Sequence, residues 1–240
     1  SIHGGEYDVI SVDGIGKLKG DASAKRIIID GIFKGKGKLA AEEIEIDGVA
    51  RVFRNIKSKS VKIDGILKLR RASLYADKII CDGVIVGNRE INADEIHIDG
   101  ICSVSKMYGD KIVLKNNKNK GGRLINANIP IKIEQFFKLY FGRNVSMEYS
   151  IVDVIECTDL EAEDIVAKVI QANRVKLKGN CKIGKLICDG KMFIDDTCQI
   201  SEIVSKKSII NSRKEIEDMA NKSLVKILDL YKDGKINADE

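Results

Sequence analysis

The sequence predicts an all-β protein built as a parallel β-helix, or solenoid, of 17-residue coils, with a short helical insertion and a C-terminal helix. Three observations lead to this fold class. The dipeptide Asp-Gly recurs at a near-constant spacing, and residues of the same character recur at fixed distances from it. Only 5% of the 240 residues are aromatic although 44% are hydrophobic. Aliphatic and small side chains must therefore fill the core, as they do in a narrow interior of stacked repeats.

The Asp-Gly repeat sets the period. Its copies begin at Asp13, Asp30, Asp47, Asp64, Asp82 and Asp99, so that successive sequence numbers differ by 17, 17, 17, 18 and 17. The residues three and one before each Asp are apolar, the residue two after it is β-branched, and in the later five copies the residue six before it is small. Alternation of this kind is typical of a strand with one buried face. Gly at the turn permits positive φ or close backbone approach.

A 17-residue unit with two or three short strands cannot bury its own inner face, but identical units stacked about 4.8 Å apart can. The alternative is a series of hairpins, because Asp-Gly also favours the tight hairpin turn. Hairpins would pair strands about each Asp-Gly and would not explain residue types that repeat at the coil period. We therefore expect a regular β-helix over residues 1–115.

Residues 116–155 break the period. They begin with a polar, Gly-containing loop at 116–122, and residues 131–141 hold four of the twelve aromatic residues. This aromatic stretch follows the single Pro, Pro130, and ends at Gly142, which favours a short helix with one apolar face. The alternative is an irregular excursion whose rings pack on the solenoid wall.

Coil-like spacing returns over residues 156–210, where apolar and small residues lead up to Lys168, Lys178 and Asp189. These sequence numbers differ by only 10 and 11, so full 17-residue coils do not fit them and we expect a degenerate continuation of the β-helix. Over residues 211–240 the period becomes helical. Ser212 and Glu215 form a capping box, and we expect the helix that follows to cover the last coil.

Of the two His residues, His97 is the one candidate for a catalytic base. It lies between Ile96 and Ile98 and so is predicted to point outward. Left-handed β-helix acyltransferases use a surface His as a base, but they carry six-residue repeats that are absent here. We expect no catalytic residue, no cofactor and no enzymatic activity. A solenoid acyltransferase-like enzyme is an alternative.

The cysteines show no metal-binding spacing. They form no CxxC motif and are far in sequence from His3 and His97. We expect reduced core thiols, with Cys81 and Cys188 in the inward position one before the Asp-Gly corner. The six are Cys81, Cys102, Cys157, Cys181, Cys188 and Cys198.

The last twelve residues partly match a calcium-binding EF-hand loop. Asp229, Asp233, Gly234 and Glu240 stand at matching positions, but Tyr231 occupies a position that requires an oxygen ligand. We therefore expect a helix, a turn and a helix cap here, and no metal site.

The charges are mixed along the chain. The sequence has 41 basic and 36 acidic residues, a formal net charge of +5, and no long block of one sign. A nucleic-acid-binding protein would cluster its basic residues and supply aromatic rings for stacking, so we expect no nucleic-acid partner. No apolar run approaches the roughly 20 residues that span a bilayer.

The (I/V)-x-(I/C)-D-G-(I/V) coils between Val12 and Ile101 resemble the bactofilins, a bacterial family of polymer-forming cytoskeletal proteins. The resemblance covers residues 10–115 well and 155–205 loosely. It implies a right-handed β-helix that stacks end to end into nonpolar filaments without nucleotide. The chain departs from the family pattern in its aromatic insertion and its helical C-terminal tail.

The resemblance implies a structural or scaffold protein that self-assembles by end-to-end stacking. The expected stacking interface in the first coil is formed by Ile10, Val12, Ile15 and Leu18. Further copies of the chain are the expected partner, with membrane-associated or envelope proteins as further candidates, because some bactofilins carry a membrane-binding tail. We expect no small-molecule substrate. We also expect the protein to be cytoplasmic and able to associate with the membrane. The alternative is a regulatory or binding module linked to envelope-stress signalling through the C-terminal helix.

Overall fold

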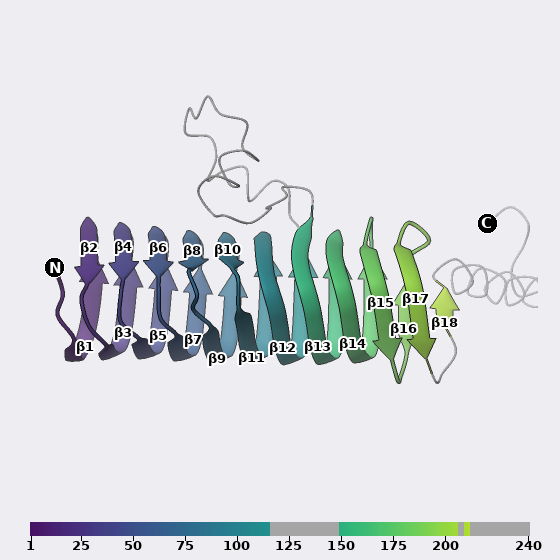
Figure 1. The fold of residues 1–240 in the computed structure, drawn as a ribbon, viewed down its shortest axis with the longest axis horizontal. Helices are drawn as coiled ribbons and strands as arrows, with labels where there is room; N and C mark the ends of the chain where they lie inside the picture. Colours follow the sequence, from purple (N-terminus) through teal and green to yellow (C-terminus); the bar gives the residue numbers. More distant parts are fainter. Residues whose placement is uncertain (116–148, 206–208, 212–240) are drawn as a thin grey trace, which may run out of the picture.

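A computed structural model describes residues 1–115, 149–205 and 209–211. Its strands form one parallel sheet wound into about ten coils. The coils stack along the long axis of the molecule, with the N-terminus at one end (Figure 1). The predicted fold class, a parallel β-helix of 17-residue coils, is confirmed. The aromatic helix expected at residues 131–141 lies outside the described residues, as does the C-terminal helix, except that Asn211 ends the last strand.

In each of the first five coils, a long strand that spans two walls is followed by a short strand on the third wall. In later coils the long and short strands merge or shorten. The strands are β1 (Gly5–Val12), β2 (Ile15–Leu18), β3 (Ala22–Ile29), β4 (Ile32–Gly35), β5 (Leu39–Ile46), β6 (Val49–Val52), β7 (Ile56–Ile63), β8 (Ile66–Leu69), β9 (Leu74–Cys81), β10 (Val84–Gly87), β11 (Glu90–Asp99), β12 (Ile101–Lys115), β13 (Ser150–Glu163), β14 (Ile165–Lys178), β15 (Lys182–Cys188), β16 (Met192–Ile194), β17 (Gln199–Ser205) and β18 (Ile209–Asn211).

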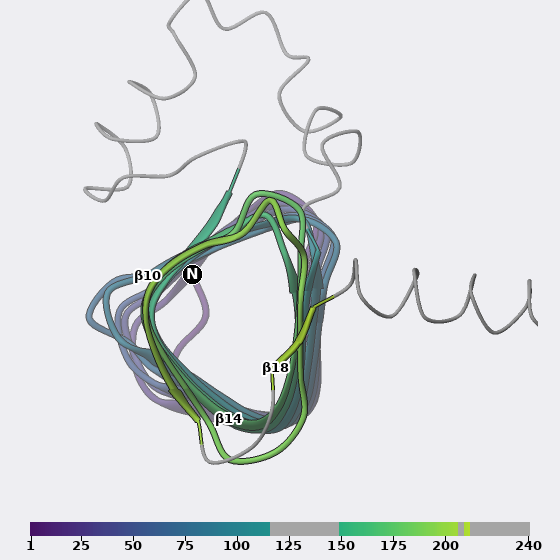
Figure 2. The ribbon, with the colours of Figure 1, turned by 90° about the vertical axis from the view of Figure 1, so that its right-hand side faces the viewer.

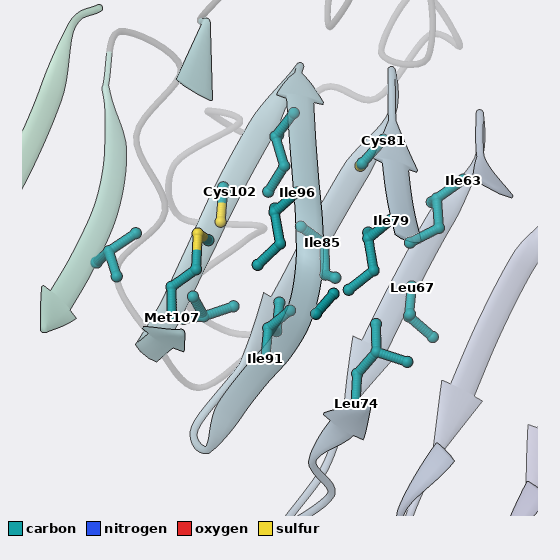
Figure 3. Close-up of a cluster of buried hydrophobic side chains, with 14 of the residues drawn as sticks. Ile63, Leu67, Leu74, Ile79, Cys81, Ile85, Ile91, Ile96, Cys102 and Met107 are labelled. Carbon is teal, nitrogen blue, oxygen red and sulfur yellow. The ribbon is translucent and has the colours of Figure 1, made fainter. Parts of the chain in front are cut away.

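Parallel pairing aligns equivalent residues of successive coils in columns. Ile27 pairs with Ile44, and Ile44 with Val61, each one coil further along the chain. Seen along the axis, the coils superimpose to a closed outline (Figure 2). The inward columns form one continuous core, in which Ile79 stacks on Ile96 of the next coil and Ile85 lies beside them (Figure 3).

The single ring in the N-terminal core shows why aromatic residues are scarce. Phe33 is 1% exposed, and its column neighbours in the adjacent coils are Gly16 and Ala50. A Cβ on Gly16 or on Gly35 would press against the Phe33 ring. A ring therefore fits this interior only where the residues around it are small, because coils about 4.8 Å apart leave no room for two stacked large side chains.

The Asp-Gly corner is held by backbone hydrogen bonds to the preceding coil. The amides of Asp47 and Gly48 both donate to the carbonyl of Ile29, at 2.9 and 2.8 Å. The next amide, that of Val49, donates to the carbonyl of Gly31 in the preceding corner at 2.9 Å. Each corner is thus the template for the next, which is why the dipeptide repeats at the coil period.

The corner glycines are required for space, not for positive φ. Among the described glycines only Gly5 and Gly179 have positive φ. A Cβ on Gly48 or Gly65 would instead overlap the carbonyl oxygen of the corner Gly one coil earlier. Of the two roles that the sequence allowed for these glycines, close backbone approach is the one that the structure uses.

The β-helix continues after residue 149, as predicted, but it does so with full coils of varying length, where incomplete coils were expected. Ile155 pairs with Ile170, Ile170 with Leu186 and Leu186 with Ile203, so the sequence numbers in this column rise by 15, 16 and 17. Lys178 does stand at the Asp position of its coil, as predicted. Lys168 does not, because it lies in β14 on the wall before that corner.

The prediction for Cys81 is confirmed, and Cys188 is buried as predicted but stands in a different column. Cys81 is buried one residue before Asp82 and pairs with Ile63. Cys188 pairs with Ala172, which pairs with Cys157, in the column of small residues six before the corner. Asp189-Gly190 therefore lies at a different bend of the coil, directly after the column of small residues, and is not equivalent to the repeated Asp-Gly corner.

In the described part of the chain, no helix has the length and hydropathy needed to cross a membrane.

The corner template makes a direct prediction for Gly65→Ala. The new Cβ overlaps the carbonyl oxygens of Gly48 and Asp47, so the corner must open and we expect a loss of about 1–3 kcal/mol in the free energy of unfolding. Thermal or urea unfolding followed by circular dichroism measures it. Gly14→Ala is the matched control, because no atom lies within 4 Å of a Cβ at that position in the first coil. Equal free energies of unfolding for the Gly65→Ala and Gly14→Ala variants would contradict the close approach of successive corners.

Candidate functional site

The N-terminal end of the solenoid carries an open strand edge. Strand β1 pairs with β3 on one side, and no described strand pairs with its outer edge. Ile2 is the one residue that extends the sheet further, by pairing with Leu18 next to the short strand β2. We call the outer edge of β1 the N-terminal edge. Its eight residues contain no Pro and leave backbone groups available for a further strand.

The structure separates the four residues predicted to form the stacking interface. Ile10, Val12 and Leu18 point inward and are buried, at 4%, 5% and 0% exposure. Ile15 points outward and is 88% exposed. Three of the four thus complete the core of the first coil. The side chains that accompany the N-terminal edge at the surface are Tyr7 and Val9, and the sequence analysis missed both.

Residues before β1 are tied to the first coil. The Ile2 amide donates to the Lys17 carbonyl at 2.8 Å, and the Lys19 amide donates to the Ile2 carbonyl at 3.0 Å. The Tyr7 hydroxyl donates to the carbonyl of His3 at 3.0 Å. Ile2 is half-buried against the core. This segment covers the short-strand wall at the end and leaves the edge of β1 open.

At the other end of the described coils, apolar side chains lose their cover. Ile203 continues the buried column of Ile170 and Leu186 and is 38% exposed. Val204 beside it is 43% exposed. No described strand pairs with the outer edges of β17 and β18. The described coils thus end in an edge on both sides, and both edges belong to the same parallel sheet.

His97 lies on the outer wall, as predicted. It is exposed and pairs in register with Ile80 and Val113 in the adjacent coils. Within the described residues, no side-chain hydrogen bond or ion pair reaches it, so the two coils beside it supply no carboxylate to orient an imidazole base. The same part of the chain holds no group of three or more His, Cys, Asp or Glu that could bind a metal ion. Asp229, Asp233 and Glu240 lie outside it.

The six cysteines are free thiols, as expected. Burial raises the pKa of Cys157 to about 12, and it also raises the pKa of Cys81. Cys181 and Cys198 stack in adjacent coils, where their neighbours Lys182 and Gln199 pair in register. A hydrogen bond between the two thiols lowers the pKa of Cys198 and raises that of Cys181.

Shallow hollows lie on the walls of the described coils. One of about 310 Å³ lies over the ion pairs Arg174–Asp159 and Lys176–Glu161. Another of about 450 Å³ follows the column of small residues past Ala93. Their charged groups come from successive coils and are spread along the wall, so neither hollow brings a nucleophile, a base and an oxyanion donor together.

The described residues form a parallel β-solenoid in which no described strand pairs with the outer edge at either end. No family model, no curated protein and no solved structure matches the chain.

The thiol pair predicts the order of alkylation. The thiolate is the reactive form, so the lowered pKa of the half-buried Cys198 gives it the largest reactive fraction near neutral pH. We expect iodoacetamide to modify Cys198 first in the native protein, with mass spectrometry of peptides as the measurement. Cys181→Ala removes the thiol that stabilises the thiolate and should shift the pH profile of Cys198 labelling upward. Faster modification of Cys81 or Cys102 than of Cys198 in the folded protein would contradict the assignment.

Proposed function

We propose that this chain is a structural scaffold protein of the bactofilin type that self-assembles by end-to-end stacking of its β-helix, without nucleotide. The observation that carries the proposal is the N-terminal edge: an eight-residue strand, β1, with no described strand on its outer side. Natural sheet proteins block such edges with Pro, bulges, charged side chains or covering segments when they remain monomeric. β1 contains no Pro, and of its two charged residues, Glu6 and Asp8, Asp8 pairs with Lys25 in the next coil.

The energetics of stacking are those of adding one more coil. A coil seated on the N-terminal edge gains backbone hydrogen bonds, each contributing about 0.5–1.5 kcal/mol net. It also covers Val9, which is 55% exposed, and the upper surface of the core residues Ile10 and Val12. The repeat makes every coil a template for the next, and the terminal coil has the same geometry as the internal ones. Self-association therefore needs no surface that the fold does not already have.

The two alternative functions receive no comparable support from the described residues. The regulatory module depends on a C-terminal helix that lies outside them. The acyltransferase depends on a base, and the adjacent coils place Ile80 and Val113 beside His97.

Charges placed on the N-terminal edge should abolish assembly. Val9 and Ser11 point outward on β1, so Val9→Lys with Ser11→Lys leaves the core intact and sets two lysines where a further coil would dock. We expect the wild type to form species that grow with concentration in sedimentation velocity and end-to-end particles in electron microscopy. The edge variant should remain monomeric.

The matched control is Ser60→Lys with Ile80→Lys, which adds two lysines at outward positions of the same wall on the internal strands β7 and β9. It should assemble like the wild type. A wild type that stays monomeric throughout the micromolar range, or equal loss of assembly in both variants, would refute the proposal.

A further inference from the structure

The short strands of the first four coils, and the turns after them, carry a cluster of basic side chains on one side of the solenoid. The outward position of each short strand carries a cation, and further cations follow in the turns. We call this surface the basic wall. Its members are Lys17, Lys19, Lys34, Lys36, Arg51, Arg54, Lys68, Arg70 and Arg71.

Strand register aligns the strand members in one ladder. Lys17 pairs with Lys34, Lys34 with Arg51, and Arg51 with Lys68 in successive coils. Coils of a parallel sheet are about 4.8 Å apart, so each cation has a like charge directly above or below it. Of the aligned stretches 15–21, 32–38, 49–55 and 66–73, only the first contains an acidic residue, Asp21, whose carboxylate accepts a hydrogen bond from the Lys38 amide at 2.8 Å.

On the other walls, basic side chains form ion pairs with acidic ones. There, a basic side chain in one coil faces an acidic one in the adjacent coil, as in Lys59–Glu42 at 3.1 Å and Lys78–Glu95 at 3.2 Å. On the basic wall, Lys19, Lys36, Arg54, Arg70 and Arg71 are exposed and form no ion pair with any residue in the described ranges. Their charge is therefore available to an external anion.

The nine residues concentrate positive charge within an otherwise acidic described surface. The described ranges hold 27 basic and 27 acidic residues, so outside these nine the acidic residues outnumber the basic ones. Lys68 is the buried member of the wall, at 4% exposure. Its burial, together with the charges of Arg51 and Arg70, lowers its pKa to about 8.

Two further features of the wall indicate the kind of anion. A column of outward β-branched residues runs beside the ladder, and at the N-terminal end Ile15 and Ile32 are 88% and 56% exposed. The turn residues beyond the ladder line a hollow of about 470 Å³ around Phe53. In this region the N-terminal coils extend beyond the outline of the later coils, on the side of β10 (Figure 2). Cations and exposed aliphatic side chains therefore share one projecting side of the solenoid.

We propose that the basic wall docks the protein on an anionic lipid bilayer, with its cations on the headgroups and Ile15 and Ile32 in the interfacial region. Clusters of basic residues beside apolar side chains have the composition of surface-bound membrane proteins. A nucleic acid would need rings to stack on its bases, and the one ring at the wall, Phe53, is covered by the Lys34 ammonium at 5.5 Å.

The test is cosedimentation of the full chain with vesicles of phosphatidylcholine alone, or with one quarter phosphatidylglycerol. We expect binding only to the anionic vesicles and its loss at high salt. Lys19→Gln, Lys36→Gln and Arg54→Gln change exposed positions outside the strands. Because each basic residue near an anionic surface contributes roughly fivefold in affinity, the triple variant should bind on the order of 100-fold more weakly.

The matched control, Lys25→Gln, Lys59→Gln and Lys78→Gln, removes the same charge from the other walls and should bind nearly as the wild type does. Ile15→Ser with Ile32→Ser leaves the charge unchanged and should weaken vesicle binding without altering binding to duplex DNA. Three outcomes would overturn the proposal. They are no binding to anionic vesicles at low salt, equal losses in the two triple variants, and duplex DNA bound in preference to the vesicles with no effect of the two Ile substitutions.

Discussion

Every feature of this solenoid depends on the in-register stacking of its coils. Since the backbone of each coil is hydrogen-bonded to the next at a separation of about 4.8 Å, a residue always meets the residue at the same position one coil away. Gly48 cannot carry a Cβ because the Gly31 carbonyl occupies that space. Phe33 is tolerated because Gly16 and Ala50 are its column neighbours. Composition, core and surface charge follow from this one geometric rule.

The first half of the fold could be predicted from the sequence because its marker and its geometry coincide. Asp-Gly stands at the corner of each of the first six coils, so counting from it recovers the columns. In the second half Lys115, Glu163 and Lys178 take the Asp position. The turns change length as well: three residues separate Leu18 from Ala22, but two separate Val104 from Met107. A fixed period then loses register, and Asp189-Gly190 offers a false marker.

The basic wall was missed for a related reason. Along the chain its cations alternate with Gly, Leu and Val, and acidic residues follow within a few positions, so the charge looks evenly mixed. The fold sorts these residues by coil position and not by sequence distance, which brings Lys17, Lys34 and Arg51 into one ladder. Reading charge down the columns would have revealed it. The residues exposed at the stacking edge were harder to predict. Apolar residues of the first coil occur at both inward and outward positions, and the difference between them is only which side of the strand faces the core.

The two proposed surfaces are physically coupled through the first coil. Lys17 and Ile15 belong to β2, next to the N-terminal edge, so any copy that stacks there brings further charge close to the end of the basic ladder. In solution like charges across such a joint oppose stacking. On an anionic bilayer the headgroups neutralise the basic walls of both copies. Confinement to the membrane surface also raises the effective concentration of the N-terminal edges. Lipid binding should therefore lower the concentration at which the ends associate, and stacking should in turn multiply the contacts of each assembly with the membrane.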